Sequence, residues 1–214
     1  MSSIVLTILI MLSAILHIRA EYTKKLSLVY VLKPLTTCLI IGLCFLQTPV
    51  VSPVYKYLIL CGLVCSLAGD VFLMLPSDQF IAGLVSFLLA HVFYIIAFIR
   101  DAGFHITYVF VGLMGLIAGI VFVTVLAHTG RLTGPVIAYT GVIMVMLWQA
   151  LERWHVAATP SSLLVVIGAC LFVFSDFILA YNRFVRQFTS GRWLNLSTYF
   201  AAQWCIALSV KLFT

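Results

Sequence analysis

Runs of about 20 consecutive apolar residues recur along this chain, and they restrict its fold more than any other feature of the sequence. Each run is long enough to cross a hydrocarbon core of roughly 30 Å as an α-helix. The breaks between the runs are short and rich in proline, glycine or charged residues, which favour turns. Eight runs cover the chain, at about residues 3–18, 28–47, 55–75, 79–100, 105–127, 134–153, 161–182 and 193–213.

The composition excludes a water-soluble fold. With 64% hydrophobic residues, 8% charged residues and a mean hydropathy of +1.21, the chain has too few polar side chains to cover a globular surface. The short breaks place consecutive helices antiparallel in one bundle. We therefore predict an all-α polytopic membrane protein, with a single domain of eight transmembrane helices over residues 1–214. The stretch Met1–Ile18 lacks the basic start and cleavage site of a signal peptide, and is predicted to be a retained helix.

Charge and cysteine usage narrow the possible partners. A net charge of +6 would suggest nucleic acid for a soluble chain, but in a membrane protein basic residues collect in cytoplasmic loops. We therefore reject a nucleic-acid partner. All six cysteines lie inside apolar runs, without a C-x-x-C motif or a histidine-rich tract, so neither disulfides nor a zinc site is indicated. We predict no cofactor and no metal.

Basic residues are distributed unequally between the two sets of loops, and this predicts an orientation. The face with more of them should be cytoplasmic, with both termini on the other side. The bias and the compact loops fit a bacterial inner membrane, although a protein of the endoplasmic reticulum would look similar. One face holds Arg19, Lys24, Lys25, Arg131, Arg183, Arg186 and Arg192, and the other holds Lys56, Arg100, Arg153 and Lys211.

Two aspartates interrupt the apolar runs and are the strongest functional signal. Asp70 lies in CGLVCSLAGDVFLML and Asp176 in IGACLFVFSDFIL, and a glycine, Gly62 or Gly168, lies eight positions before each. A charge at the centre of a membrane helix costs roughly 2.5–3.5 kcal/mol, so such residues usually face a protein interior or a wet cavity. Both lie roughly 8–9 Å from the expected cytoplasmic helix ends, at 1.5 Å per residue. We predict that they form one catalytic pair.

Further polar side chains are expected near this layer, and they are candidates for binding a substrate. Lys33, Thr36 and Thr37 begin the second run, next to a proline that is tolerated near a helix start. Tyr199 and Gln203 continue a polar stripe that begins at Asn195, and His91 and Tyr94 are neighbours one turn apart. The candidate binding residues are Lys33, Thr36, Thr37, His91, Tyr94, Tyr199 and Gln203.

Structural roles compete with each of these interpretations. Asp70 could be hydrogen-bonded to Ser66 or paired with Lys33, and Lys33 could extend to the interface as an anchor. His91 could be a packing histidine, and the stripe from Asn195 could hold helices together. Three further acids are expected to be solvated at helix ends and in loops, namely Glu152, Asp78 and Asp101.

A weak internal repeat relates the two halves of the chain. The G-x7-D pattern of the third run recurs in the seventh, Lys33-Pro34 has a counterpart in Gly134-Pro135, and Ala90-His91 has one in Ala202-Gln203. An offset of four helices preserves direction through the membrane. The pattern predicts two four-helix halves related by a pseudo-two-fold axis along the membrane normal, with the aspartates near that axis.

The pair suggests a class of chemistry. Two neighbouring carboxyl groups cannot both ionise easily, so one stays protonated while its partner remains anionic. Such pairs catalyse reactions through oxocarbenium-like cations, as glycosidases show, and they need no metal. The expected depth lies just below the headgroups, where the glycerol linkage of a lipid would be.

The motifs VLKPLTT, SLAGDVFLM, FLLAHVFYI, GACLFVFSDFILA and TYFAAQ, in this order, resemble the YhhN-like lysoplasmalogenase family over most of the chain. The resemblance implies an eight-helix membrane enzyme. It implies hydrolysis of the vinyl ether bond of lysoplasmalogens, taken from the bilayer, to a fatty aldehyde and glycerophosphoethanolamine or glycerophosphocholine. Headgroup preference, oligomeric state and the activity of an individual member stay open.

The residues and the resemblance agree on a mechanism. One aspartic acid would protonate the β-carbon of the enol ether, and the other carboxylate would stabilise the cation and deprotonate the attacking water. The sequence does not assign these two roles. Lys33, Thr36 and Thr37 would bind the phosphate, while His91, Tyr94, Tyr199 and Gln203 would position water and the glycerol hydroxyl.

Other functions use two intramembrane acids. A proton-coupled transporter is the main alternative, because paired acids and a pseudo-repeat also describe transporters, but it would place the acids near the midplane of the membrane. An intramembrane aspartyl protease fits poorly, because Leu67 replaces the first glycine of G-x-G-D and Ser175 precedes the second acid. The third alternative is a structural protein in which the aspartates only join helices.

Overall fold

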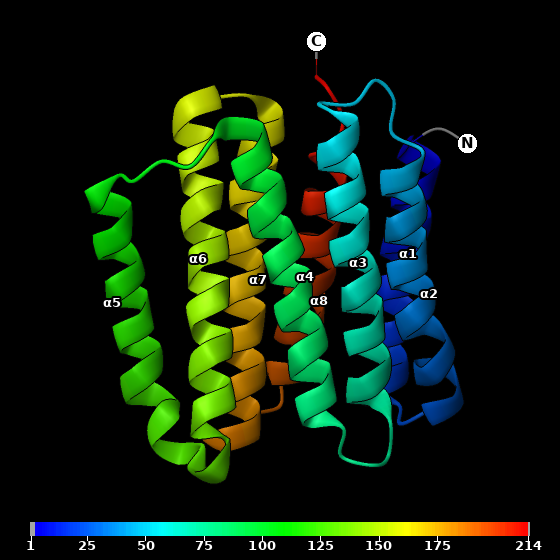
Figure 1. Ribbon diagram of the computed structural model, residues 1–214. Helices are drawn as coiled ribbons and strands as arrows, with labels where there is room; N and C mark the ends of the chain where they lie inside the picture. The colour runs from blue at the N-terminus through cyan, green and yellow to red at the C-terminus, as the bar shows by residue number, and fades with distance from the viewer. Residues whose placement is uncertain (1–2, 214) are drawn as a thin grey trace.

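The computed structural model describes residues 3–213 as a bundle of eight α-helices (Figure 1). Within these residues β-pairing is limited to an isolated antiparallel bridge between Val50 and Lys211. Two short 3-10 helices, η1 (Leu126–His128) and η2 (Gly130–Leu132), precede the sixth helix. The helices are α1 (Ser3–Tyr22), α2 (Leu26–Phe45), α3 (Pro53–Met74), α4 (Phe80–Ala102), α5 (Tyr108–Thr124), α6 (Thr133–Ala157), α7 (Pro160–Phe184) and α8 (Gly191–Leu208).

The predicted all-α membrane bundle is confirmed. Seven of the helices in the described chain are long and apolar enough to cross a membrane. The exception is α8, which has 18 residues and carries the polar stripe from Asn195 to Gln203. Because α8 buries Tyr199 and Gln203 against its neighbours, its polar groups are directed into the protein.

Proline and hydroxyl side chains start two of the long helices. Ser52 accepts a hydrogen bond from the backbone N–H of Tyr55, and Pro53 opens α3. Thr159 and Ser162 form a reciprocal capping box, and Pro160 opens α7. These residues satisfy N–H groups that have no partner within the helix, so the breaks predicted from proline and threonine become sharp helix starts.

The ends of the helices differ from prediction where charged residues follow the apolar run. Helix α1 continues to Tyr22, beyond the expected end near residue 18, and so takes Arg19 and Glu21 into its last turn. The helix α5 is shorter than predicted, because the chain turns into η1 after Thr124. The extension of α1 places Glu21 in the wall of the cavity that also contains Asp70 and Asp176.

All four connections on the basic side of the chain lie at one end of the bundle (Figure 1). This end, called the basic end below, carries the α1–α2, α3–α4, α5–α6 and α7–α8 connections. The connections α2–α3, α4–α5 and α6–α7 lie at the opposite end, as do the beginning of α1 and the end of the described chain. The beginning of α1 and the end of α8 lie at the same end of the bundle because the number of α-helices in the described chain is even, and the side of the membrane that this end faces stays a prediction.

The contacts between helices follow a similar scheme in the two four-helix halves, as the internal repeat of the sequence predicts. Each half contains one tight hairpin, α3–α4 or α7–α8, and the second helix of each half packs on the fourth helix of the other, α2 on α8 and α6 on α4. The two glycines of the G-x7-D pattern allow these hairpins to close. A Cβ atom at Gly62 would lie 2.3 Å from the Tyr94 ring of α4, and one at Gly168 would lie 2.8 Å from Ile206 of α8.

Helix α5 lies at the edge of the bundle (Figure 1), where its main helix partner is α6. Its first turn is attached by Glu152 of α6, whose carboxylate accepts hydrogen bonds from the backbone N–H and hydroxyl of Thr107 and from Trp148. The expectation that Glu152 is solvated is wrong, since its side chain is buried. A carboxylate at a helix N-terminus satisfies free N–H groups, and this explains its position.

Candidate functional site

Asp70 and Asp176 line the same cavity, near the basic end of the bundle. This polar cavity has a volume of about 160 Å³ and is walled by α1, α2, α3, α4, α7 and α8. Six other charged or polar side chains line it: Glu21, Lys33, Ser175, Arg192, Asn195 and Tyr199. The fold therefore brings together two acids that are more than 100 residues apart in the sequence, next to two cations and a third acid.

Asp70 lies on the last turns of α3 and is almost completely buried. Its Oδ2 atom accepts hydrogen bonds from the hydroxyls of Thr37 and Tyr199, at 2.7 and 2.8 Å. Its Oδ1 atom is 3.4 Å from the ammonium of Lys33. A buried carboxylate is stabilised in its charged form by hydrogen-bond donors and a nearby cation. These contacts favour the anionic form of the Asp70 carboxyl group, while its burial opposes any charge there.

The hydrogen bonds to Asp70 extend into the core of the bundle. Tyr199, which donates to Asp70, also accepts a hydrogen bond from the side-chain amide of Gln203 at 3.3 Å. The carbonyl of that amide accepts a hydrogen bond of 2.8 Å from the hydroxyl of Tyr94. Three of the predicted binding residues thus form one buried chain behind Asp70, in which every hydroxyl and amide has a partner.

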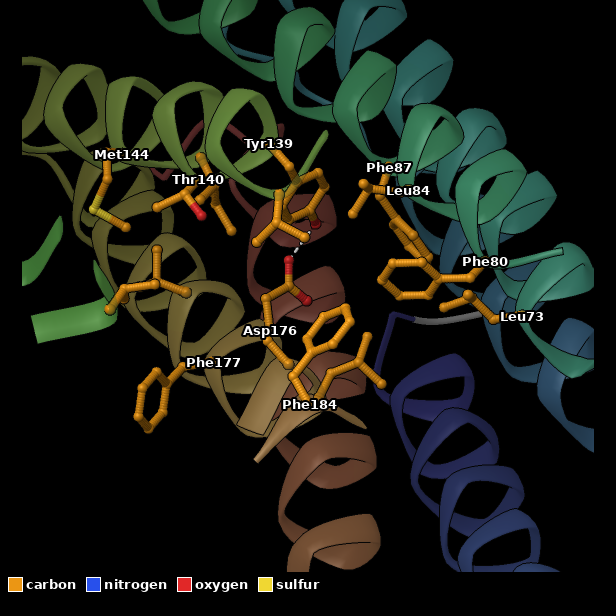
Figure 2. A pocket seen from close by; sticks show the side chains of 16 residues that line it. Leu73, Phe80, Leu84, Phe87, Tyr139, Thr140, Met144, Asp176, Phe177 and Phe184 are labelled. Atoms are coloured by element: carbon orange, nitrogen blue, oxygen red, sulfur yellow. Dashed lines mark hydrogen bonds between the residues drawn. The ribbon is translucent and has the colours of Figure 1, made fainter. Parts of the chain in front are cut away.

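Asp176 has a different environment, although it lines the same cavity. It is partly exposed, and its Oδ2 atom accepts a short hydrogen bond from the hydroxyl of Tyr139 on α6. Figure 2 shows its carboxyl group pointing to Tyr139, with aromatic and aliphatic side chains on the other sides. No ion pair within residues 3–213 involves Asp176. This carboxyl group is held by a phenol in apolar surroundings.

A second cavity, mostly apolar and of about 60 Å³, adjoins the polar one at Asp176 (Figure 2). The two cavities share Leu73, Phe87, Asp176 and Leu179. The apolar cavity continues between α4, α6 and α7, and it reaches Val121 on α5. Asp176 is consequently the acid at the boundary between a charged compartment and a hydrocarbon-like compartment.

The structure separates the predicted binding residues into different environments. Lys33 and Tyr199 line the polar cavity, and both contact Asp70. The hydroxyl of Thr37 also contacts Asp70, whereas that of Thr36 bonds to the Leu32 carbonyl and to Ser13, away from the acids. Both threonine hydroxyls therefore already have partners within the protein.

His91 is also remote from the carboxyl groups. Its ring is fully buried among aromatic rings, with centroids 4.7 Å from Phe172 and 5.4 Å from Tyr139. Neither ring nitrogen has a hydrogen-bond partner among the residues that the structure describes. It lines neither of the two cavities. Its contact with the Tyr139 ring makes it a support for the residue that holds Asp176.

The sequence interpretation did not select three residues that shape the site. Tyr139, which holds Asp176, was hidden in an apolar run in which tyrosine is unremarkable. Glu21 and Arg192 were assigned to breaks between helices, yet both line the polar cavity. The only signal in the sequence was the charge of Glu21 and Arg192. A polar segment between two apolar runs does not indicate which other helices its residues contact.

This geometry suits acid–base chemistry on an amphiphile. Two carboxyl groups with different hydrogen-bond partners line one cavity, and the apolar cavity begins at one of them, Asp176. Within residues 3–213 no group of three histidine, cysteine, aspartate or glutamate side chains is placed to bind a metal ion. The acids themselves are the groups available to donate and accept protons.

Comparisons with known proteins show what this chain is similar to. The family model described as the YhhN family matches residues 28–210. The uncharacterized membrane protein YhhN of Escherichia coli O6:H1 is 27% identical over 205 residues, which are 96% of this chain and 98% of that protein. No solved structure matches.

Mammalian relatives carry the name lysoplasmalogenase. Lysoplasmalogenase TMEM86B of Mus musculus is 35% identical over 159 residues, or 69% of this chain and 61% of that protein. Its counterpart in Homo sapiens is 32% identical over 166 residues, or 72% of this chain and 64% of that protein. The chain thus matches less than two thirds of the length of these two relatives. With its family model covering most of the eight-helix bundle, the chain is a multi-pass integral membrane protein that belongs to the YhhN family.

Proposed function

We propose that this protein is a lysoplasmalogenase, which hydrolyses the vinyl ether bond between the glycerol and the hydrocarbon chain of a lysoplasmalogen. The observation that carries this proposal is the position of Asp176 where the polar and apolar cavities meet. In such a lipid the vinyl ether lies where the polar glycerophosphate ends and the hydrocarbon chain begins. The names of the mammalian relatives support the same activity.

The hydrocarbon chain has a path beyond the apolar cavity. A groove of about 250 Å³ between α5, α6 and α7 shares Val121, Val173 and Phe177 with that cavity. The groove is more open than the cavity and is lined almost entirely by apolar side chains. A lipid tail that starts at Asp176 would leave the bundle beside α5, whose packing is mainly against α6.

The environments of the two aspartates suggest separate roles. Asp176 is the general acid, because it contacts a phenol in apolar surroundings and borders the compartment for the alkenyl chain. Asp70 is the general base, because Lys33 and two hydroxyls stabilise its anionic form. Tyr139 positions the first acid, and Tyr199 positions the second.

The proposed reaction conserves every proton. Asp176 donates its proton to the β-carbon of the enol ether, which leaves an oxocarbenium ion that the Asp70 carboxylate stabilises. Water adds to the cationic carbon and gives a proton to Asp70, which forms a hemiacetal. When the hemiacetal collapses, its hydroxyl proton returns to Asp176 and Asp70 protonates the departing glycerol oxygen. One water is consumed, and a fatty aldehyde and a glycerophospho product leave.

Aldehyde release by the purified full chain in detergent tests the activity. Lysoplasmalogen should yield aldehyde, whereas a lysolipid with a saturated alkyl ether should yield none, because only the vinyl ether can be protonated on carbon. Absence of release from folded protein, across several headgroups, would contradict the proposal. Proton-coupled transport would then be measured with the same preparation.

Reaction in heavy water tests the mechanism. Protonation of the β-carbon by the enzyme should place one deuterium on the carbon next to the aldehyde carbonyl, measured by mass spectrometry of the rapidly trapped product. Aldehyde without this deuterium would contradict protonation on carbon. The Asp176→Asn variant should lose deuterium transfer and aldehyde release together, since both need its proton.

A further inference from the structure

An ion pair between Glu21 and Arg192 lines the polar cavity together with the two aspartates. Glu21 belongs to the last turn of α1 and Arg192 to the first turn of α8. The Arg192 Nη1 atom is 2.7 Å from the Glu21 Oε2 atom. The arginine side chain is 64% exposed and the glutamate side chain 18% exposed. The pair therefore forms the accessible, charged part of the cavity wall.

Arg192 is the cation of this cavity that a ligand can reach most easily. Lys33 is only 12% exposed, and it contacts both the carboxylate and the backbone carbonyl of Asp70. Within residues 3–213, Arg192 donates a side-chain hydrogen bond through a single guanidinium nitrogen. Its other N–H groups remain available to a ligand there, and a guanidinium binds phosphate oxygens in pairs. A phosphate near the site would therefore meet Arg192 before it met Lys33.

Glu21 supplies the opposite charge next to this position. One carboxylate oxygen contacts Arg192, and the other is 3.8 Å from the Nε2 atom of His17. If an anion bound Arg192 and nothing else changed, Glu21 would lose its partner and repel the anion. A ligand that carries both a phosphate and a cationic amine avoids this, because it replaces one internal ion pair with two intermolecular pairs.

A second ion pair at the same end shows what a structural pair looks like. Arg183 and Asp78 are 2.8 Å apart, and the Arg183 guanidinium lies 4.0 Å above the Phe80 ring. Neither residue lines the polar cavity. Exposed pairs of this kind contribute about 0–1 kcal/mol to stability. The Glu21–Arg192 pair differs because it shares a cavity with both candidate catalytic acids.

We propose that Arg192 and Glu21 bind the headgroup of the lipid. Arg192 binds its phosphate, and Glu21 binds its cationic ammonium group. The inference rests on the proposed function and adds a specificity to it. The site should favour a zwitterionic phosphodiester headgroup over a phosphate monoester, which carries more negative charge and no amine. Lys33 then serves Asp70 and not the headgroup.

Binding of analogues that cannot be hydrolysed tests this specificity independently of turnover. Lysolipids with a saturated alkyl ether and a phosphoethanolamine, a phosphocholine or a phosphate headgroup would be titrated against the full chain in detergent. Wild type should bind the two zwitterionic lipids at least about tenfold more tightly than the phosphate lipid. Equal affinities for all three would overturn the proposal.

Variants separate the two halves of the headgroup site. Glu21→Gln should reduce the affinity for zwitterionic lipids about tenfold while keeping or improving that for the phosphate lipid. Arg192→Gln should weaken all three. Asp78→Asn is the matched control, because it breaks the other ion pair and should leave all affinities unchanged. An unchanged headgroup preference in Glu21→Gln would contradict the role of Glu21.

Exchanging the charges of Glu21 and Arg192 distinguishes recognition of the headgroup from a purely structural ion pair. The double variant Glu21→Arg and Arg192→Glu can rebuild the ion pair, so a purely structural pair would be rescued. Recognition would not be rescued, because the phosphate and amine occupy fixed positions along the lipid. Aldehyde release without headgroup preference would refute this inference alone, whereas absence of release with retained headgroup preference would refute only the hydrolase.

Discussion

Two ion pairs within residues 3–213 place a mostly buried cation beside an acid, and they differ in what surrounds them. At the basic end, Lys33 is 3.4 Å from Asp70 and both line the polar cavity. At the opposite end, Arg153 is 2.7 Å from Asp101 and donates a second hydrogen bond to Ser161. A buried charge in a membrane bundle is therefore by itself weak evidence of a functional site.

The Arg153 pair is explained by helix packing. Its guanidinium lies over the Tyr55 ring at 4.7 Å, and it joins α6 to α4 and α7 through Asp101 and Ser161. Asp101 was expected to be solvated; the residue is exposed at the end of α4, but its side chain is only 18% exposed and its carboxylate is paired with Arg153. The Lys33 pair differs because a second acid faces the same space. A cavity and a second proton-carrying group distinguish a candidate site from a structural ion pair.

The largest expected effect concerns the acids of the site. Asp70→Asn and Asp176→Asn should each reduce aldehyde release by about 10²–10⁴-fold, because general acid–base groups contribute on that scale. Asp176→Asn should change thermal unfolding in detergent little, since Asp176 has no ion-pair partner within residues 3–213 and asparagine keeps the size of the side chain. Asp70→Asn should also lower the unfolding temperature, because it removes the partner of Lys33. Asp101→Asn should lower the unfolding temperature while leaving the activity of the folded protein normal. Loss of activity in Asp101→Asn at unchanged stability would break the comparison.

The second largest effect is expected on stability, when Arg153 of the structural ion pair is replaced. Arg153→Met should cost about 3–5 kcal/mol of unfolding free energy, because it removes a buried cation with its hydrogen bond to Ser161 and leaves the Asp101 carboxylate without its partner. Equilibrium unfolding of the detergent-solubilised protein would measure this loss. Arg183→Met serves as the control for removing an arginine, and it should cost at most about 1 kcal/mol. Similar losses in both variants would show that burial of Arg153 has no special importance.

A smaller effect is expected where α3 and α4 approach each other behind the site. In Gly62→Ala the new methyl group would overlap the Tyr94 ring, so we expect a loss of about 1–3 kcal/mol from overpacking. Displacement of Tyr94 should also weaken its hydrogen bond to Gln203 and lower activity. Gly42→Ala is the matched control, because nothing lies within 4 Å of its Cβ position. It should be neutral or slightly stabilising.

The smallest effect is expected for the exposed pair at the basic end. Asp78→Asn removes the partner of Arg183 and should change unfolding free energy by less than about 1 kcal/mol, with normal aldehyde release. Raising the salt concentration should have a similarly small effect in wild type. A large loss of activity would show that the α3–α4 connection contributes to the site, which the comparison does not predict.

Several features of the site were predictable from local sequence. Asp70 and Asp176 stand out because an acid in an apolar run is costly, and their shared spacing from Gly62 and Gly168 predicted that they lie close to one another. Tyr199 and Gln203 follow from helical periodicity, which places every fourth residue on one face. The positions of these residues could be predicted because composition and period are properties of a single helix.

Contacts between helices could not be predicted in the same way. Tyr139 holds Asp176 from another helix, and nothing in its own segment indicates this partner. Glu21 became a site residue because α1 continues past the apolar run. His91 lies near Tyr139 in three dimensions yet does not reach the cavities. Each outcome depends on how helices rotate and where they end, which packing decides.

The membrane-spanning helical bundle follows from the sequence, because apolar runs have no backbone partners in lipid and must form helices. The inward direction of the two acids follows from it as well, because lipid cannot solvate them. The tertiary structure adds the cavity that both acids line, their different hydrogen-bond partners, and the apolar compartment that begins at Asp176. The physical reason is that hydrogen bonds and ion pairs between helices depend on how each helix is rotated about its axis and how deep it lies in the membrane. The hydrophobicity of a segment is largely insensitive to both.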